Sequence, residues 1–161
     1  MLPMAQLRAA LTELGYQGVQ TYLQSGNVII DPGRPGLRQL PASLERAIAD
    51  EFGLEVRVLV RTRKELAEVA VEHPFGDGHS DHSRLHVIFM ETSPTADKVA
   101  DLEPDRSPPD SFEVRGREVY LSYPNGQGRS KLDLAYFERM LGVAGTARNW
   151  NTITKLLAMM S

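Results

Sequence analysis

The chain has 161 residues, of which 42% are hydrophobic and 24% are charged, and its formal net charge is −3. This length and composition are typical of a folded domain and exclude a disordered or fibrous chain. The sequence contains no cysteine, which excludes disulfides, cysteine-bound metals and thiol nucleophiles and favours a cytoplasmic location.

The first part of the chain predicts a helix followed by a β-hairpin. Apolar residues recur every three or four positions between Pro3 and Gly15, which indicates an amphipathic helix. In residues 19–24, Val19, Thr21 and Leu23 alternate with Gln20, Tyr22 and Gln24. Residues 28–30 are β-branched, and a glycine-containing turn lies between the two segments. We therefore expect an antiparallel hairpin at this position.

A loop with three prolines at residues 31–41 precedes a second helix, a strand and a third helix. The second helix ends at Gly53, because glycine tolerates the left-handed conformation that often follows a helix. Valines at alternate positions of residues 56–60 predict a strand that is buried on one face. Thr62 and Glu65 form a capping box, which predicts that the third helix begins at this point.

The second half predicts four strands and three helices. The expected strands are residues 85–90, 112–115, 118–123 and 144–148. A short helix follows the first of them, and a later helix begins at a capping box of Ser130 and Asp133 and ends at Gly142. The last helix carries apolar residues on one face from Ile153 to Met160.

The two halves have the same order of elements if one strand is supposed before Pro3. We therefore expect an α+β fold of two tandem ferredoxin-like βαββαβ-type units, the first lacking its N-terminal strand. That strand and its connection amount to about 10 residues. We therefore expect either that the product starts upstream of Met1 or that the sheet has unpaired backbone groups on either side of a gap. The units are expected at residues 1–75 and 84–161, within one compact domain of residues 1–161.

The segment between the two expected units is rich in histidine and aspartate. The side chains that could meet a divalent metal there are Asp77, His79, Asp81 and His82. No predicted helix or strand fixes their geometry, so we expect a solvated linker and no metal site. Nothing else in the sequence indicates a cofactor.

A glycine-containing loop precedes the predicted helix at Ser130. Its candidate ligand-binding residues are Gly126, Gly128, Arg129, Ser130 and Lys131. Two cationic side chains beside the N-terminus of a helix favour an anionic ligand, because backbone N–H groups point outward there. The alternative is an ordinary loop that leaves a hairpin and enters a capped helix.

Two further polar segments lie at predicted turns. Their candidate residues are Ser25, Gly26 and Asn27 in the first half, and Arg148, Asn149, Trp150 and Asn151 in the second. The asparagines could cap a helix while the indole closes the core, or the same groups could contact a ligand. If the halves are repeats, the tips of the two hairpins could flank one cleft between them.

Three segments carry a resemblance to a known family. These segments are Tyr22–Ile29, Gly116–Pro124 continued by Gly128–Leu132, and Arg148–Thr152. Together they closely resemble the bacterial family known as domain of unknown function 1697. The resemblance implies two ferredoxin-like halves and no established activity, cofactor or catalytic residue. This chain has Asp133-Leu134 where the family usually has a small polar residue followed by asparagine, which weakens a binding role for that helical turn.

The function that these patterns favour is binding of a small polar or anionic ligand in a cleft between the two units. One alternative is binding of single-stranded nucleic acid. The negative net charge and the aromatic fraction of 7% argue against it, and so does the expected placement of Tyr120 and Tyr123 on opposite faces of a strand. Another is an enzyme that acts on a phosphate- or carboxylate-bearing substrate, although no catalytic motif is present. We expect no nucleic-acid or membrane partner, and the sequence contains no indication of oligomeric state.

Overall fold

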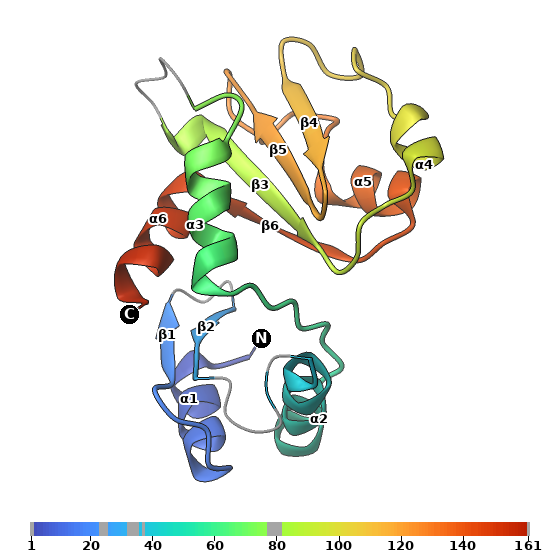
Figure 1. The fold of residues 1–161 in the computed structure, drawn as a ribbon. Coiled ribbons are helices and arrows are strands. Elements are labelled where there is room, and N and C mark those ends of the chain that lie inside the picture. The colour runs from blue at the N-terminus through green and yellow to red at the C-terminus, as the bar shows by residue number, and fades with distance from the viewer. Residues whose placement is uncertain (1, 23–25, 32–35, 37, 77–81, 161) are drawn as a thin grey trace. The chain divides into compact units, whose positions relative to one another are not determined.

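The computed structural model describes residues 2–22, 26–31, 36, 38–76 and 82–160 (Figure 1). The chain divides into two compact units, which are residues 1–60 with 158–161, and residues 61–157. Both contain helices and antiparallel strands, so the fold is α+β as predicted. Within the described ranges, no helix is both long enough and apolar enough to cross a membrane.

The first unit contains two helices and a hairpin. Its elements are α1 (Met4–Glu13), β1 (Gln20–Tyr22), β2 (Asn27–Ile29) and α2 (Leu40–Phe52). The hairpin is antiparallel, as predicted, and Thr21 lies opposite Val28. Leucines from both helices form the core, and hairpin side chains such as Val28 pack against it. Gly53 ends α2 with φ +65°, the left-handed conformation that the sequence indicates.

The strand predicted at residues 56–60 is not formed. In the described structure residues 53–62 belong to no sheet, although Val58 and Val60 pack against the core of the first unit. The backbone N–H of Val58 donates instead to the carboxylate of Glu45, at 2.8 Å. Alternating apolar residues indicate only that one side of a segment is buried. A strand also requires a neighbouring backbone to pair with, which residues 56–60 lack, and the strand prediction was therefore wrong.

The second unit contains a four-stranded antiparallel sheet with strand order β4-β5-β3-β6. The strands are β3 (Leu85–Met90), β4 (Ser111–Arg115), β5 (Glu118–Ser122) and β6 (Gly145–Asn149). The helices are α3 (Arg63–Glu72), α4 (Ala96–Ala100), α5 (Leu134–Leu141) and α6 (Trp150–Met159), with the short 3₁₀ turn η1 (His82–Arg84) before β3. From β3 to β6 this is the βαββαβ order predicted for the second half. That the first half is a repeat of it remains a prediction.

The two faces of the four-stranded sheet are covered differently. Ile88 and Leu121 lie on one face and pack with Phe137 of α5. The other face carries Tyr120, whose ring meets the ring of His73 directly after α3. Figure 1 shows α3 in front of the sheet and α5 behind it. Because both faces are covered, β3 is buried along its whole length, as its uniformly apolar sequence predicts.

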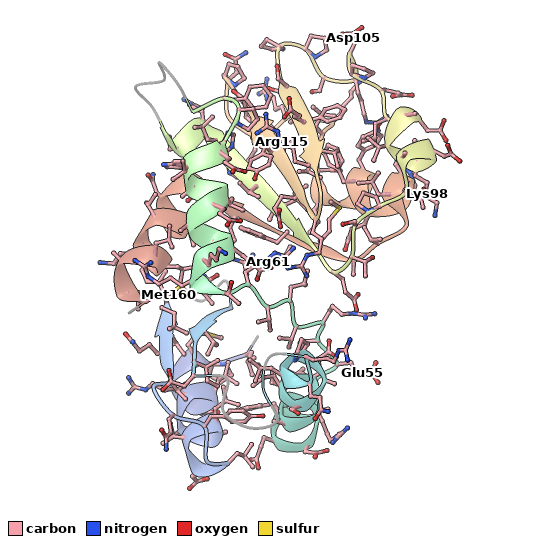
Figure 2. The ribbon with its side chains drawn as sticks, in the orientation of Figure 1. Glu55, Arg61, Lys98, Asp105, Arg115 and Met160 are labelled. Atoms are coloured by element: carbon pink, nitrogen blue, oxygen red, sulfur yellow. The ribbon has the colours of Figure 1, made fainter. Side chains whose placement is uncertain are left out.

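The helix α3 belongs to the second unit, so the division falls at residues 60–61 and not within the predicted segment of residues 76–83. Arg61 anchors the start of this unit, and its guanidinium donates to the carboxylate of Glu118 at 3.0 Å and to the carbonyl oxygen of Met90 at 2.7 Å (Figure 2). In the first turn of α3, Glu65 accepts from Arg117 at 2.6 Å. These contacts join α3 to the sheet, and no local sequence signal could have indicated them.

Candidate ligand-binding loop

The candidate site is the loop of residues 124–132, which we call the binding loop. It lies at one end of the sheet of the second unit and connects β5 to α5. The N–H of Tyr123 donates to the carbonyl oxygen of Arg84 at 2.9 Å, which extends the pairing of β5 with β3 up to the loop. The binding loop therefore begins from a fixed strand end.

Two turns shape the binding loop. The N–H of Gly126 donates to the carbonyl oxygen of Tyr123 at 2.9 Å, and that of Ser130 donates to Gln127 at 3.0 Å. Gly126 has φ +86°, and a Cβ placed on it would lie 2.7 Å from a guanidinium nitrogen of Arg84. The backbone conformation therefore favours glycine, and a side chain at this position would also displace the end of the Arg84 side chain.

The predicted capping role of Ser130 is wrong. Asp133 is the N-cap of α5, and its carboxylate accepts from the N–H of Tyr136 at 2.9 Å. The hydroxyl of Ser130 accepts instead from the N–H of Leu132 at 3.1 Å, which forms a local turn before the helix. Since a carboxylate already occupies the N-terminus of α5, an anionic ligand would have to bind the loop itself rather than the helix end.

The C-terminal part of the binding loop is fastened to the segment before β4. The N–H of Lys131 donates to the hydroxyl of Ser107 at 3.1 Å, and the carbonyl oxygen of Lys131 accepts from Arg106 at 2.9 Å. The hydroxyl of Tyr123 donates to the carbonyl oxygen of Leu132 at 2.6 Å. These bonds hold the backbone of Lys131 on both sides, so its side chain extends from a fixed point.

The middle of the binding loop carries unused donors. In the described part of the chain, the backbone N–H groups of Gln127, Gly128 and Arg129 have no hydrogen-bond acceptor. The side chains of Arg129 and Lys131 are exposed, and neither has an acidic partner among the same residues. Three N–H groups and two cations are a combination that can bind an anion.

Buried polar groups lie beside the loop, on the face of the sheet that α5 covers. His86 is 9% exposed, its ring meets the ring of Tyr123 edge to face at 5.0 Å, and its Nδ1 has no hydrogen-bond partner among the described residues. Burial lowers the pKa of His86 below the usual value near 6.5. The imidazole is therefore neutral at pH 7.

Asp110 lies close enough to Tyr123 for its charge to act on the phenol, and it is 9% exposed. One carboxylate oxygen accepts from the hydroxyl of Ser107 at 3.1 Å, and the other is buried without a partner in the part of the chain described. Burial raises the pKa of Tyr123, and the negative charges of Asp110 and Asp133 raise it further. The phenol therefore stays protonated and serves as a hydrogen-bond donor.

The segment Arg148–Asn151 has mainly a structural role. The side-chain oxygen of Asn149 accepts from the N–H of Thr152 at 2.8 Å, which caps α6, and Trp150 packs edge to face on His73 at 5.2 Å. Arg148 donates to the hydroxyl of Thr146 at 2.6 Å, and burial lowers its pKa.

The structure places only part of this segment near the binding loop. Asn149 pairs with His86 in the sheet and so lies at the same end as the binding loop. Arg148 pairs with Val87, on the opposite face from His86, and Asn151 is exposed on α6.

The candidates of the first unit form a turn. Ser25 lies outside the described residues, and Gly26 is exposed with φ +88°. Asn27 is 6% exposed, and its side chain donates to the carbonyl oxygen of Tyr22 at 2.9 Å, across the hairpin. The turn-forming interpretation of these residues is the one that the contacts support.

The candidate metal segment lies mostly outside the described residues, which include neither Asp77, His79, Asp81 nor the side chain of His82. In the remainder that is described, no three histidine or acidic side chains meet in a way that could hold a metal ion. The Nδ1 of His73 accepts from the N–H of Phe75 at 3.2 Å, and its Nε2 lies 3.2 Å from the carbonyl oxygen of His86. Both nitrogens of His73 therefore have structural partners.

Sequence reasoning missed Arg84, Ser107 and Asp110 as neighbours of the binding loop. Each lies beside the end of a strand, and the strand order β4-β5-β3 brings these ends together. Strand limits were predictable from the sequence, but the local pattern does not say which strand ends are neighbours.

Comparison with known proteins places the chain in a family. A search of curated proteins finds no match. A solved structure described as that of the conserved bacterial protein SP0830 from Streptococcus pneumoniae is similar, with a TM-score of 0.72 and 22% identity over 100% of this chain and 90% of that one. At this identity the similarity supports the fold alone. The family described as protein of unknown function (DUF1697) matches residues 1–120, a range that ends before the binding loop. The chain therefore belongs to the DUF1697 family.

Proposed function

We propose that the chain binds a small polar or anionic ligand on the binding loop of the second unit. The observation that carries the proposal is a run of three N–H groups, from Gln127 to Arg129, that have no acceptor among the described residues and lie beside two cations without acidic partners in the same part of the chain. Backbone N–H groups that follow one another in a turn form a concave donor surface for anions. Charged donors such as Arg129 and Lys131 strengthen the hydrogen bonds that they make.

The attachments of the loop favour binding over an ordinary surface role. Both backbone groups of Lys131 are held by the segment before β4, and Gly126 is held against Arg84. Little conformational freedom of the backbone is then left to lose when a ligand binds, which reduces the cost of association. The side chains of Arg129 and Lys131 remain exposed and accessible.

A nucleic-acid interface has less support. Base stacking requires exposed aromatic rings on a sheet, and Tyr120 and Tyr123 are 2% and 4% exposed. Tyr120 lies under His73 on one face and Tyr123 beside His86 on the other. Neither ring is available to a base.

An enzymatic role also has less support than binding. A catalytic acid or base must reach its substrate, and the two groups with shifted pKa values at this end of the sheet are His86 and Tyr123. The Nδ1 of His86 is buried, and the hydroxyl of Tyr123 is engaged with the carbonyl oxygen of Leu132. Neither group can contact a ligand held on the loop without a rearrangement.

Titration of ¹⁵N-labelled protein with inorganic phosphate, sulfate and succinate at low ionic strength tests the proposal. We expect saturable chemical-shift changes at the amides of Gln127, Gly128 and Arg129. Lys131→Gln should weaken the binding about fivefold, the effect of losing one exposed charge. Lys155→Gln, at an exposed position of α6, removes the same charge away from the loop and should leave binding unchanged.

Two results would contradict the proposal. One is the absence of saturable shifts in the loop with all three anions. The other is an equal loss of affinity in the Lys131 and Lys155 variants, because that would indicate general attraction by charge and not a site.

A further inference from the structure

A hollow of about 620 Å³ lies in the first unit, away from every residue that the sequence singled out. It is bounded by the end of α1, by Asp31 after β2 and by one side of α2. This volume falls in the range of small-molecule sites, roughly 300–1,000 Å³. All the residues discussed below belong to residues 1–60, so the hollow is a property of the first unit alone.

Among the described residues, four charged side chains line the hollow, and they are exposed. Arg46, Asp50 and Glu51 come from α2, and Asp31 comes from the segment after β2, where its carboxylate lies close to Gly18. Within the described residues none of these side chains has a hydrogen bond or an ion pair. The described lining therefore carries three carboxylates and one guanidinium, a net charge of −2.

The spacing along α2 separates opposite charges by one helical turn. Arg46 and Asp50 are four residues apart, so they lie on the same side of the helix with their Cβ atoms about 6 Å apart. They do not pair with each other. A ligand that carries a carboxylate and an ammonium group can therefore bridge them, with its carboxylate at Arg46 and its ammonium at Asp50.

One wall of the hollow is apolar. Leu14 is 53% exposed and is one of three exposed large hydrophobic residues in the described part of the chain. Tyr16 and Ala47 are half-buried next to it. An aliphatic chain laid along this wall would remove the Leu14 side chain from water, which is favourable by the hydrophobic effect.

The acidic side chains are spread around the hollow and do not converge. No group of three histidine or acidic residues in the described structure is placed to hold a metal ion. Carboxylates that lie apart from one another match a ligand with separate positive groups better than they match a single metal cation. The ligand that satisfies the lining has a carboxylate, two amino groups and an aliphatic stem between them.

We propose that this hollow binds a basic amino acid of the lysine type. Its carboxylate binds Arg46, its α-ammonium binds Asp50, and its terminal ammonium lies near Glu51. The stem covers Leu14. The inference is independent of the binding loop, because no residue of the second unit takes part.

The test is a titration of the full ¹⁵N-labelled chain with lysine, followed at the amide of Gly15 in the wall of the hollow. Norleucine has the same stem without the terminal ammonium, and cadaverine has both amines without the carboxylate. We expect lysine to bind about fivefold more tightly than either, because each lacks one charged contact. Equal affinities for lysine and norleucine, or no saturable shift at Gly15, would overturn the proposal.

A matched pair of substitutions sharpens the test. Glu51→Gln removes a charge from the rim of the hollow, whereas Glu55→Gln removes one from the segment that follows α2 (Figure 2). Both positions are exposed, so both variants should fold, which their thermal unfolding checks. We expect weaker lysine binding with Glu51→Gln and with Arg46→Gln, and unchanged binding with Glu55→Gln. A loss of the same size with Glu55→Gln would contradict the assignment, and Lys131→Gln should not alter lysine binding at all.

Discussion

Gly126 shows how much of the binding loop depends on one residue. Its positive φ disfavours any L side chain, and a guanidinium nitrogen of Arg84 lies 2.7 Å from the place where a Cβ would be. Gly128 lies two residues further along the same loop, and open space surrounds the place of its Cβ. The two glycines look equivalent in the sequence and differ completely in their surroundings.

Gly126→Ala is therefore expected to lower the free energy of unfolding by about 1–3 kcal/mol, through backbone strain and displacement of Arg84. Gly128→Ala should change it by less than about 0.5 kcal/mol. Urea denaturation of both variants measures the difference. Equal stabilities would show that Arg84 and the loop adjust without cost.

His86 makes the stability of the protein depend on pH. Its pKa in the folded state is lowered by burial, so below about pH 6.5 the unfolded chain binds a proton more readily than the folded chain. The contribution of His86 to the free energy of unfolding is therefore fully present above that pH and decreases as the pH falls. The decrease approaches about 1.4 kcal/mol per pH unit for one group.

His86→Phe keeps an aromatic ring beside Tyr123 and removes the titrating group. Between about pH 7.5 and pH 5.5 we expect the unfolding free energy of the unsubstituted protein to fall relative to that of the variant, because only the unsubstituted protein has the titrating imidazole. Urea denaturation at several pH values checks it. A difference that stays constant over this range would mean that burial does not shift the pKa of His86.

At the level of elements, local signals in the sequence located most helices and strands. The capping box of Thr62 and Glu65 is present at the start of α3, and both glycines expected to end helices, Gly53 and Gly142, are left-handed. The cap of α5 was predicted wrongly because two nearby residues can each cap a helix. Ser130 and Asp133 can both cap a helix, and Asp133 does so, since Ser130 closes a turn before the helix.

The start of α3 is held by an ion pair that the sequence does not reveal. The side chain of Arg61 is 7% exposed and that of Glu118 is 17% exposed, and the two lie 57 positions apart in the chain. Burial lowers the pKa of Arg61, which the hydrogen bond to Glu118 opposes. The charge is tolerated because the guanidinium has several acceptors at once.

Arg61→Met is expected to destabilise the protein by about 3 kcal/mol, because the carboxylate of Glu118 is then left half-buried without its partner. Lys64→Met changes an exposed cation of α3 itself and should have an effect within about 0.5 kcal/mol. Thermal or urea unfolding distinguishes the two. Similar effects for both variants would show that the ion pair contributes nothing.

At the scale of the whole molecule, the two units differ in how their strands are supported. The sheet of the second unit has four strands, and β3 is paired on both sides and buried throughout. The described sheet of the first unit is a hairpin with three residues in each strand. Short hairpins are only marginally stable by themselves and depend on the side chains packed against them.

Native-state hydrogen exchange should reproduce this difference. We expect the amides of Val87 and Ile88 in β3 to exchange most slowly, through global unfolding. The amides of β1 and β2 should exchange faster, through local opening of the hairpin. Equal protection in the hairpin and in β3 would show that the first unit opens only when the whole chain unfolds.

The sequence by itself determined the α+β class, the positions of the helices, both hairpins and the absence of cysteine chemistry, because periodicity, caps and turn glycines act over a few residues. It also placed Arg129 and Lys131 in a loop before a helix. Only the tertiary structure decided that residues 56–60 are not a strand, that Arg84 lies against Gly126, that the ring of His86 meets Tyr123, and that α3 belongs to the second unit. These outcomes depend on which distant segments of the chain become neighbours. The interactions that decide this are contacts between residues far apart in the sequence, and a local sequence pattern contains no information about them.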